Sequence, residues 1–194
     1  EDVYAVLYTA YSCNGPGVAL ALTQDFRTFE RRGLILAPED KDAAMFPRRF
    51  NGQWAAIHRP VTALSANMNL AYSENLRHFG STRTILEARA GAWWDARKIG
   101  MSAPPIETQE GWLVIYHGVK TTGSGVLYRN GLALFDLERP DVCLLRSDPW
   151  CFGPRDLMER VGDVDNVVFP CGTTVQDDGD TLFVYYGQAD TSVG

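Results

Sequence analysis

The sequence has no apolar run near the roughly 18 residues that a membrane span requires. Its first residues also lack the basic segment that opens a signal peptide, so we expect a soluble, cytoplasmic chain. Basic charge is scarce as well: 18 Lys and Arg stand against 24 Asp and Glu, which gives a net charge of −6. Because nucleic acids and anionic membranes attract basic surfaces, we expect neither as a partner, and any anion site must be local.

Metal-binding and redox spacings are absent too. The four cysteines, Cys13, Cys143, Cys151 and Cys171, form no C-x-x-C pair, so we predict neither a zinc site nor a redox motif. Buried free thiols in a reducing compartment are expected, and one disulfide stays open as an alternative. Helical periodicity is nearly missing, since only residues 154–161 favour a short helical turn within a loop.

What the sequence does contain is a series of short strands separated by turn residues. Alternating or apolar segments predict strands at residues 4–9, 18–22, 54–58, 68–72, 112–116, 132–136 and 182–186. Residues 12–17 (Ser-Cys-Asn-Gly-Pro-Gly) predict a hairpin loop of moderate length. We place the openings of the second and third units at Trp54 and Trp112.

The strands repeat along the chain. Residues 19–36 align with residues 69–86 without a gap at an offset of 50, with 6 identities in 18 positions. The identical pairs are Leu20/Leu70, Ala21/Ala71, Arg27/Arg77, Phe29/Phe79, Ile35/Ile85 and Leu36/Leu86. A repeated unit of roughly 50 to 70 residues indicates a β-propeller, in which each unit folds as a blade of about four antiparallel strands. The chain holds about three to four such units, so it forms either a small closed ring or part of a larger one.

The stretch from Trp93 to His117 carries a dense cluster of polar and aromatic side chains. It places Trp93, Trp94, Asp95, Lys98 and His117 around a Gly/Ser/Pro loop that leads into the strand at residues 112–116. Polar groups at a loop mouth above a strand are a common way for a rigid scaffold to present a binding site. Alternatively, the tryptophans are core anchors and the charged residues form a solvated turn.

Short motifs follow one another along the chain. They are residues 8–11 (Tyr-Thr-Ala-Tyr), 17–21 (Gly-Val-Ala-Leu-Ala), 41–47 (Lys-Asp-Ala-Ala-Met-Phe-Pro), 58–60 (His-Arg-Pro), 94–100 (Trp-Asp-Ala-Arg-Lys-Ile-Gly), 103–106 (Ala-Pro-Pro-Ile), 111–118 (Gly-Trp-Leu-Val-Ile-Tyr-His-Gly), 166–172 (Asn-Val-Val-Phe-Pro-Cys-Gly) and 185–190 (Tyr-Tyr-Gly-Gln-Ala-Asp). In these motifs and their order the chain resembles glycoside hydrolase family 130, the β-mannoside phosphorylases and β-mannosidases, over nearly all of its length. The resemblance implies a five-bladed propeller with the sugar site at its central mouth. It also implies that a first blade is missing, so we expect a single propeller domain over residues 1–194 that is incomplete at both ends.

The same resemblance raises the question of the proton donor. Cleaving a glycosidic bond requires a donor for the leaving oxygen and a nucleophile on the opposite face. In the family, the donor is an aspartate in a Glu-Asp-Pro-Arg motif upstream of the strand at residues 4–9. Here Glu1-Asp2 is followed by Val3-Tyr4, so we interpret Asp2 as a turn residue. No residue matches the donor, and we expect little or no activity from this chain alone.

A phosphorylase uses inorganic phosphate in place of water, so several cations must converge on one anion. The resemblance implies that Arg59, Lys98 and His117 bind phosphate, together with Lys41. The Lys41-Asp42 pair stands where many phosphorylases of the family have Arg-Asn, and Lys keeps the charge but loses the forked geometry. The alternatives are a surface cation at 59, a solvated lysine at 98 and a core histidine at 117.

For the sugar we predict contacts from Asp42, Asp95, Asp190 and Asn166, because carboxylates accept two hydroxyl hydrogen bonds. The alternative for Asp190 is a turn acid. The first function we predict is an inverting β-mannoside phosphorylase that releases mannose 1-phosphate. A β-mannosidase, which would need two carboxylates around a water molecule, and a non-catalytic sugar-binding propeller are the alternatives. A β-mannoside oligosaccharide and phosphate are the expected partners, no cofactor or metal is expected, and a homo-oligomer stays open.

Overall fold

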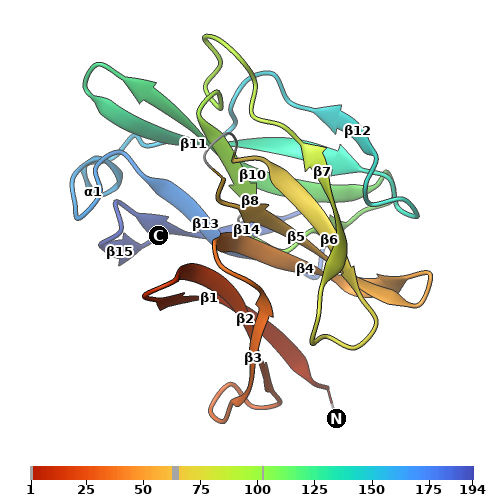
Figure 1. The fold of residues 1–194 in the computed structure, drawn as a ribbon. Coiled ribbons are helices and arrows are strands. Elements are labelled where there is room, and N and C mark those ends of the chain that lie inside the picture. Colours follow the sequence, from red (N-terminus) through yellow and green to blue (C-terminus); the bar gives the residue numbers. More distant parts are fainter. Residues whose placement is uncertain (1, 63–65, 102) are drawn as a thin grey trace.

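Four antiparallel sheets and one short helix make up the secondary structure of the described residues (Figure 1). The computed structural model describes residues 2–62, 66–101 and 103–194. The first sheet has the order β1-β2-β3, with β1 (Tyr4–Ser12), β2 (Gly15–Thr23) and β3 (Glu30–Leu36). The second has the order β4-β5-β6-β7, with β4 (Asp40–Phe50), β5 (Gln53–Pro60), β6 (Met68–Ser73) and β7 (Gly80–Leu86).

The other two sheets follow in the second half of the chain. The third has the order β8-β10-β11-β12, and β9 also pairs with β10; its strands are β8 (Lys98–Met101), β9 (Ile106–Glu107), β10 (Trp112–Thr122), β11 (Gly125–Phe135) and β12 (Cys143–Arg146). The helix α1 (Leu157–Arg160) lies within the predicted helical segment and precedes the fourth sheet. That sheet contains β13 (Val168–Val175), β14 (Leu182–Gln188) and β15 (Ser192–Val193). Apart from β8 and β9, which both pair with β10, strands that follow one another in the chain pair within each sheet, as in propeller blades.

The first two sheets repeat one another in register. Tyr4 pairs with Thr23 in the first sheet, and Trp54 pairs with Ser73 at the equivalent place in the second. The pairings of β2 with β3 and of β6 with β7 keep the same offset. The repeat predicted from the sequence is therefore confirmed, and β1 corresponds to β5.

Two boundaries differ from the prediction. We placed the openings of the second and third units on β5 and β10, but β4 precedes β5 and β8 precedes β10. The pairing of β4 with β5 shifts between Lys41 and Ala44, and such bulges interrupt the period of two by which a strand is recognised. The hairpin between β1 and β2 is also tighter than predicted, because Ser12 pairs with Gly15 and leaves only residues 13–14 in the turn.

Hydrophobic clusters join neighbouring sheets. Between the second and third sheets, Phe46, Phe50 and Trp112 meet edge to face with ring centroids 5.1 to 5.9 Å apart. Burying a side chain such as Phe46 contributes roughly 1.5–3 kcal/mol. A smaller cluster around Leu20 and Ala71 joins the first and second sheets. The strands β4, β8 and β13 thereby lie near the middle of the molecule, and β3, β7 and β12 lie toward its periphery (Figure 1).

Two further expectations are settled by the described residues. The four cysteines are free, but Cys13, Cys151 and Cys171 are exposed, so the expectation of buried thiols is wrong. Within the described part of the chain, no helix has the length and hydrophobicity that a bilayer span needs.

Candidate functional site

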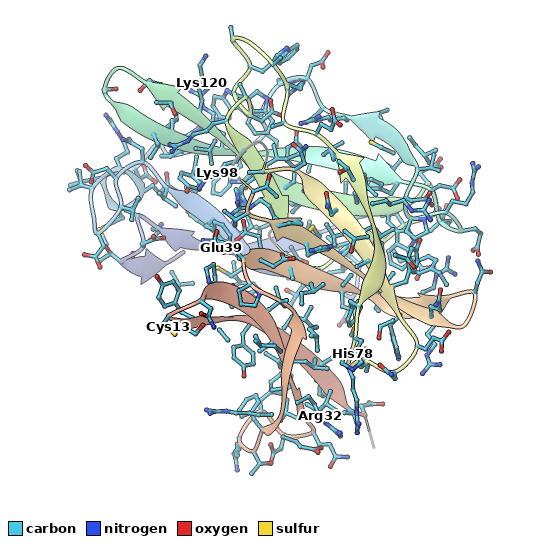
Figure 2. All side chains as sticks on the ribbon, in the orientation of Figure 1. Cys13, Arg32, Glu39, His78, Lys98 and Lys120 are labelled. Carbon is cyan, nitrogen blue, oxygen red and sulfur yellow. The ribbon has the colours of Figure 1, made fainter. Side chains whose placement is uncertain are left out.

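A cavity of about 500 Å³ receives residues from all four sheets. Its polar lining consists mainly of residues predicted from the sequence, namely Lys41, Asp42, Arg59, Lys98, His117 and Asp190. Figure 2 shows Lys98 near the middle of the molecule. The fold therefore brings six of the eight predicted phosphate and sugar residues to one place.

Three cations reach the cavity from neighbouring strands. Lys41 of β4 lies directly opposite Arg59 of β5, and Lys98 begins β8. The Arg59 side chain is only 4% exposed. Among the described residues neither Lys41 nor Lys98 forms an ion pair, so both ammonium groups are available to an anion. In an acidic chain, the fold thus gathers three positive charges at one cavity.

Asp42 orders the cations around it. Its φ is +53°, and it lies where the β4–β5 pairing shifts between Lys41 and Ala44. A bulge of this kind redirects a side chain. The Oδ2 atom of Asp42 accepts a hydrogen bond from Arg59 Nε at 2.6 Å and lies 3.4 Å from His117 Nε2. Asp42 therefore acts here as a positioning residue for the guanidinium and the imidazole.

His117 is buried against aromatic rings. Its ring centroid lies 4.7 Å from that of Phe169 and 5.9 Å from that of Tyr128, and the residue is 1% exposed. Burial, helped by the nearby cations and opposed by Asp42, lowers the pKa of His117 from 6.5 to about 4. The imidazole is therefore neutral at neutral pH, and it offers hydrogen bonding rather than charge.

Acidification is expected to destabilise the fold through His117. Between the unfolded pKa of 6.5 and the folded pKa of about 4, the unfolded chain binds a proton at this residue and the folded chain does not. The free energy of unfolding therefore rises with pH across this window, and on the order of 3 kcal/mol is lost as the pH falls through it. Urea unfolding from pH 4 to 7 measures this slope. His117→Gln should flatten it, whereas the control His78→Gln, at an exposed histidine, should not; equal slopes in both variants would contradict the assignment.

Gly100 provides the space in which these groups meet. It pairs with His117 across β8 and β10. A Cβ atom at this position would lie 2.6 Å from Asp42 Oδ2 and 2.6 Å from His117 Cε1. Both distances are shorter than any ordinary non-bonded contact, so a side chain here would displace the carboxylate or the ring.

Asp190 and Asn166, two of the predicted sugar contacts, differ in whether they reach the cavity. Asp190 lines the cavity, and its φ is +52°. Asn166, with φ of +59°, does not line it. Instead, the backbone carbonyl of Asn166 accepts a hydrogen bond from the Tyr128 N–H at 3.1 Å, which supports the cavity wall from behind. Residues 189–191 form the turn between β14 and β15, so Asp190 is a turn residue that also lines the cavity.

Asp95 does not reach the cavity, contrary to the prediction. The residue is 0% exposed. Its carboxylate accepts hydrogen bonds from Arg89 Nε at 2.9 Å, from Arg146 at 2.7 Å and from the Tyr116 hydroxyl at 3.0 Å. Because side chains alternate along a strand, Tyr116 and the adjacent His117 point to opposite faces of β10. Asp95 is therefore the centre of a buried ion-pair network on the other face of the sheet.

Sequence reasoning missed Tyr128 and Thr9, which also line the cavity. Tyr128 lies opposite Val119, which in turn lies opposite Lys98, so its ring is 5.3 Å from the Lys98 ammonium. Tyr128 belongs to β11, and none of the motifs named in the sequence falls within that strand. For Thr9 a signal did exist, because the offset of 50 makes it the counterpart of Arg59.

The fold and the cavity together define a β-propeller with a cation-lined site shared by its blades. The whole chain, residues 1–194, matches the family model for glycoside hydrolase family 130, described as beta-1,4-mannooligosaccharide phosphorylase. The chain therefore belongs to this family, and the predicted propeller class is confirmed.

Relatives of known activity support the same placement. The chain is 40% identical over 194 residues to a beta-1,2-mannobiose phosphorylase from Listeria innocua, an alignment that covers 99% of this chain and 53% of the relative. It is 34% identical over 197 residues to a 1,2-beta-oligomannan phosphorylase from Thermoanaerobacter sp., of which it covers 63%. The chain thus spans only part of the length of the relatives that it matches.

Solved structures agree with the fold. The Listeria innocua enzyme in complex with beta-1,2-mannobiose superposes with a TM-score of 0.91 over 99% of this chain and 53% of its own. A glycosyl hydrolase from Bacteroides ovatus, 23% identical, gives a TM-score of 0.84 over 99% of this chain and 60% of its own. The second comparison supports the fold alone.

Proposed function

We propose that this chain forms the phosphate- and mannoside-binding part of an inverting β-mannoside phosphorylase. The observation that carries the proposal is the convergence of Lys41, Arg59 and Lys98 on one cavity, beside the neutral His117. Inorganic phosphate is the co-substrate that matches several cations and a neutral donor at one point. The relatives named as mannoside phosphorylases supply the sugar class.

In this reaction, a phosphate oxygen attacks the anomeric carbon of the terminal mannose as the glycosidic C–O bond breaks. Attack from the face opposite the leaving oxygen inverts the anomeric configuration and gives mannose 1-phosphate. The ammonium groups of Lys41 and Lys98 and the remaining guanidinium N–H groups of Arg59 hold the phosphate, while Asp42 keeps the Arg59 Nε in place. The carboxylate of Asp190 accepts hydrogen bonds from sugar hydroxyls at the cavity wall.

The leaving oxygen must gain a proton, and we assign no donor within residues 1–194. Among the described residues that line the cavity, the carboxylates are Asp42 and Asp190. Asp42 already accepts a hydrogen bond from Arg59. The Glu-Asp-Pro-Arg donor motif that the family resemblance implies does not occur in this sequence.

The charge of the cavity favours phosphorolysis over hydrolysis. An inverting hydrolase uses a second carboxylate as general base for water, roughly 6.5–9.5 Å from the acid. Here three cations line the cavity, and the buried Asp95 carboxylate does not reach it. A cationic environment stabilises an anionic nucleophile such as phosphate.

Arg59→Ala should weaken phosphate binding roughly tenfold to a hundredfold, because a charged hydrogen bond contributes about 1.5–3 kcal/mol. Calorimetric titration with inorganic phosphate measures the change. Since this variant leaves Asp42 without its partner, Lys98→Ala, which breaks no ion pair in the described structure, should be tested beside it. The matched control is Arg49→Ala, because Arg49 lies over Trp54 and does not line the cavity. Wild-type affinity in both cavity variants would refute the phosphate site.

A further inference from the structure

We propose a second saccharide-binding site on the third sheet, in a hollow lined by Trp93, Trp94, Lys120, Arg129, Asp148 and Trp150. We call it the indole hollow, because three of the five tryptophans of the chain meet there. Its volume is about 360 Å³. The choice of a saccharide as ligand rests on the function proposed above.

The cavity lined by Lys41, Arg59, Lys98 and His117 is called the phosphate cavity from here on. The indole hollow lies on the opposite face of the third sheet. Arg129 is paired with Gly118, and Lys120 lies two residues beyond Gly118, so both side chains point to one face. His117 and Tyr128, which line the phosphate cavity, point to the other face. In Figure 2, Lys120 lies nearer the upper edge of the molecule than Lys98 does. The sheet therefore separates the two sites.

The indoles of the exposed Trp93 and the partly buried Trp150 are held in place by arginines. The Arg89 guanidinium lies 3.9 Å from the Trp93 ring centroid, and that of Arg129 lies 4.8 Å from the Trp150 centroid. Arg89 is fixed in turn by the carboxylate and the carbonyl of Asp148, at 3.2 and 3.3 Å. Trp93 is still 41% exposed. Rings that are already ordered lose little conformational entropy when a ligand binds, which favours affinity.

Polar groups surround these apolar rings. The Asp148 side chain is 81% exposed, and Arg129 forms no ion pair with any residue that the structure describes. The Lys120 ammonium donates to the Ala92 carbonyl at 2.7 Å, at the edge of the same hollow. A carboxylate accepts hydrogen bonds from hydroxyls and a guanidinium donates them in a planar fork.

This combination matches a sugar ring. A pyranose has an apolar C–H face, which packs on an indole, and a rim of hydroxyls, which bonds to the carboxylate and the guanidinium. An anionic ligand fits less well, because the exposed Asp148 carboxylate lies beside the cations. The hollow therefore suits a neutral β-mannoside oligosaccharide, bound away from the place of cleavage.

The test is a titration of the ¹⁵N-labelled chain with β-1,2-mannotetraose and with β-1,4-mannotetraose. At least one should shift the indole N–H resonances of Trp93 and Trp150. Arg129→Gln should weaken both responses about tenfold, and Trp93→Ala should weaken the remaining Trp150 response about tenfold. Arg49→Gln is the matched control, because Arg49 lies over Trp54 at the same 4.8 Å and lines no part of the hollow. Arg59→Ala, which acts on the phosphate cavity, should leave the indole response unchanged.

The outcomes separate this inference from the proposed function. If the tetraoses shift only resonances that Arg59→Ala also affects, the indole hollow is not a sugar site and the proposed function stands. If the indole response behaves as expected but inorganic phosphate does not bind the cavity, the hollow is established and the proposed function fails. If neither tetraose shifts any resonance, or if Arg49→Gln weakens the indole response as strongly as Arg129→Gln, the inference is overturned.

Discussion

Replacing Asp95 by alanine is expected to lower the free energy of unfolding by about 3–5 kcal/mol. The carboxylate is fully buried and balances the charges of Arg89 and Arg146, whose side chains are only 15% and 17% exposed. Its removal takes away the carboxylate partner of Arg146, leaves Arg89 with the exposed Asp148 alone, and deprives the Tyr116 hydroxyl of its acceptor. Urea unfolding monitored by tryptophan fluorescence measures the loss.

The matched control for Asp95→Ala is Glu138→Ala. Glu138 also pairs with an arginine at 2.8 Å, but its side chain is 80% exposed. An exposed pair of this kind contributes about 0–1 kcal/mol, so the control should stay close to the wild type. Similar losses in the two variants would mean that the Asp95 network is no more stabilising than a surface ion pair.

Gly100→Ala is expected to disable the phosphate cavity while the sheets persist. The added methyl group would lie 2.6 Å from both Asp42 Oδ2 and His117 Cε1. Relieving these contacts by overpacking costs typically about 1–3 kcal/mol of stability. Displacing Asp42 also releases Arg59 from its hydrogen bond, so phosphate affinity should fall by about tenfold or more.

Phosphate titration together with thermal unfolding checks this prediction. The control is Gly80→Ala, at a strand glycine of β7 where an added Cβ meets no atom within 4 Å. That variant should bind phosphate like the wild type. If Gly100→Ala also binds phosphate like the wild type, the close approach of Asp42 and His117 is not needed for the site.

The parts of the fold that the sequence predicted are those with local, periodic signals. Pairings such as Tyr4 with Thr23 and Trp54 with Ser73 follow from strands that are adjacent in the chain and separated by short turns. The strand β4 has the required length but bulges between Lys41 and Ala44, so its apolar residues do not alternate regularly. Its pairing with β5 across the turn at residues 51–52, rather than a regular alternation of apolar residues, decides that it is a strand.

The site residues also divide into those that local motifs predicted and those whose position depends on strand pairing. Lys41, Arg59, Lys98 and His117 were predicted from motifs, and the fold brings all four into one cavity. Asp95 was misplaced because a carboxylate that follows paired tryptophans beside a loop was interpreted as a sugar contact, whereas its side chain lies on the other face of the sheet. The alternation along β10 separates the two faces of the sheet, and only the register reveals which face each side chain joins.

The order of strands within each sheet also has a consequence for how the chain acquires its structure. Most strand pairs form between segments that are adjacent in the sequence, such as β1 with β2, β5 with β6 and β10 with β11. Closing such short loops costs little conformational entropy, so each sheet can assemble before it meets its neighbours. Final stability then depends on the interfaces between successive sheets, as in other repeat architectures. A substitution at the Phe46–Trp112 interface should therefore change mainly the late docking of two sheets, and leave the early formation of their hairpins almost untouched.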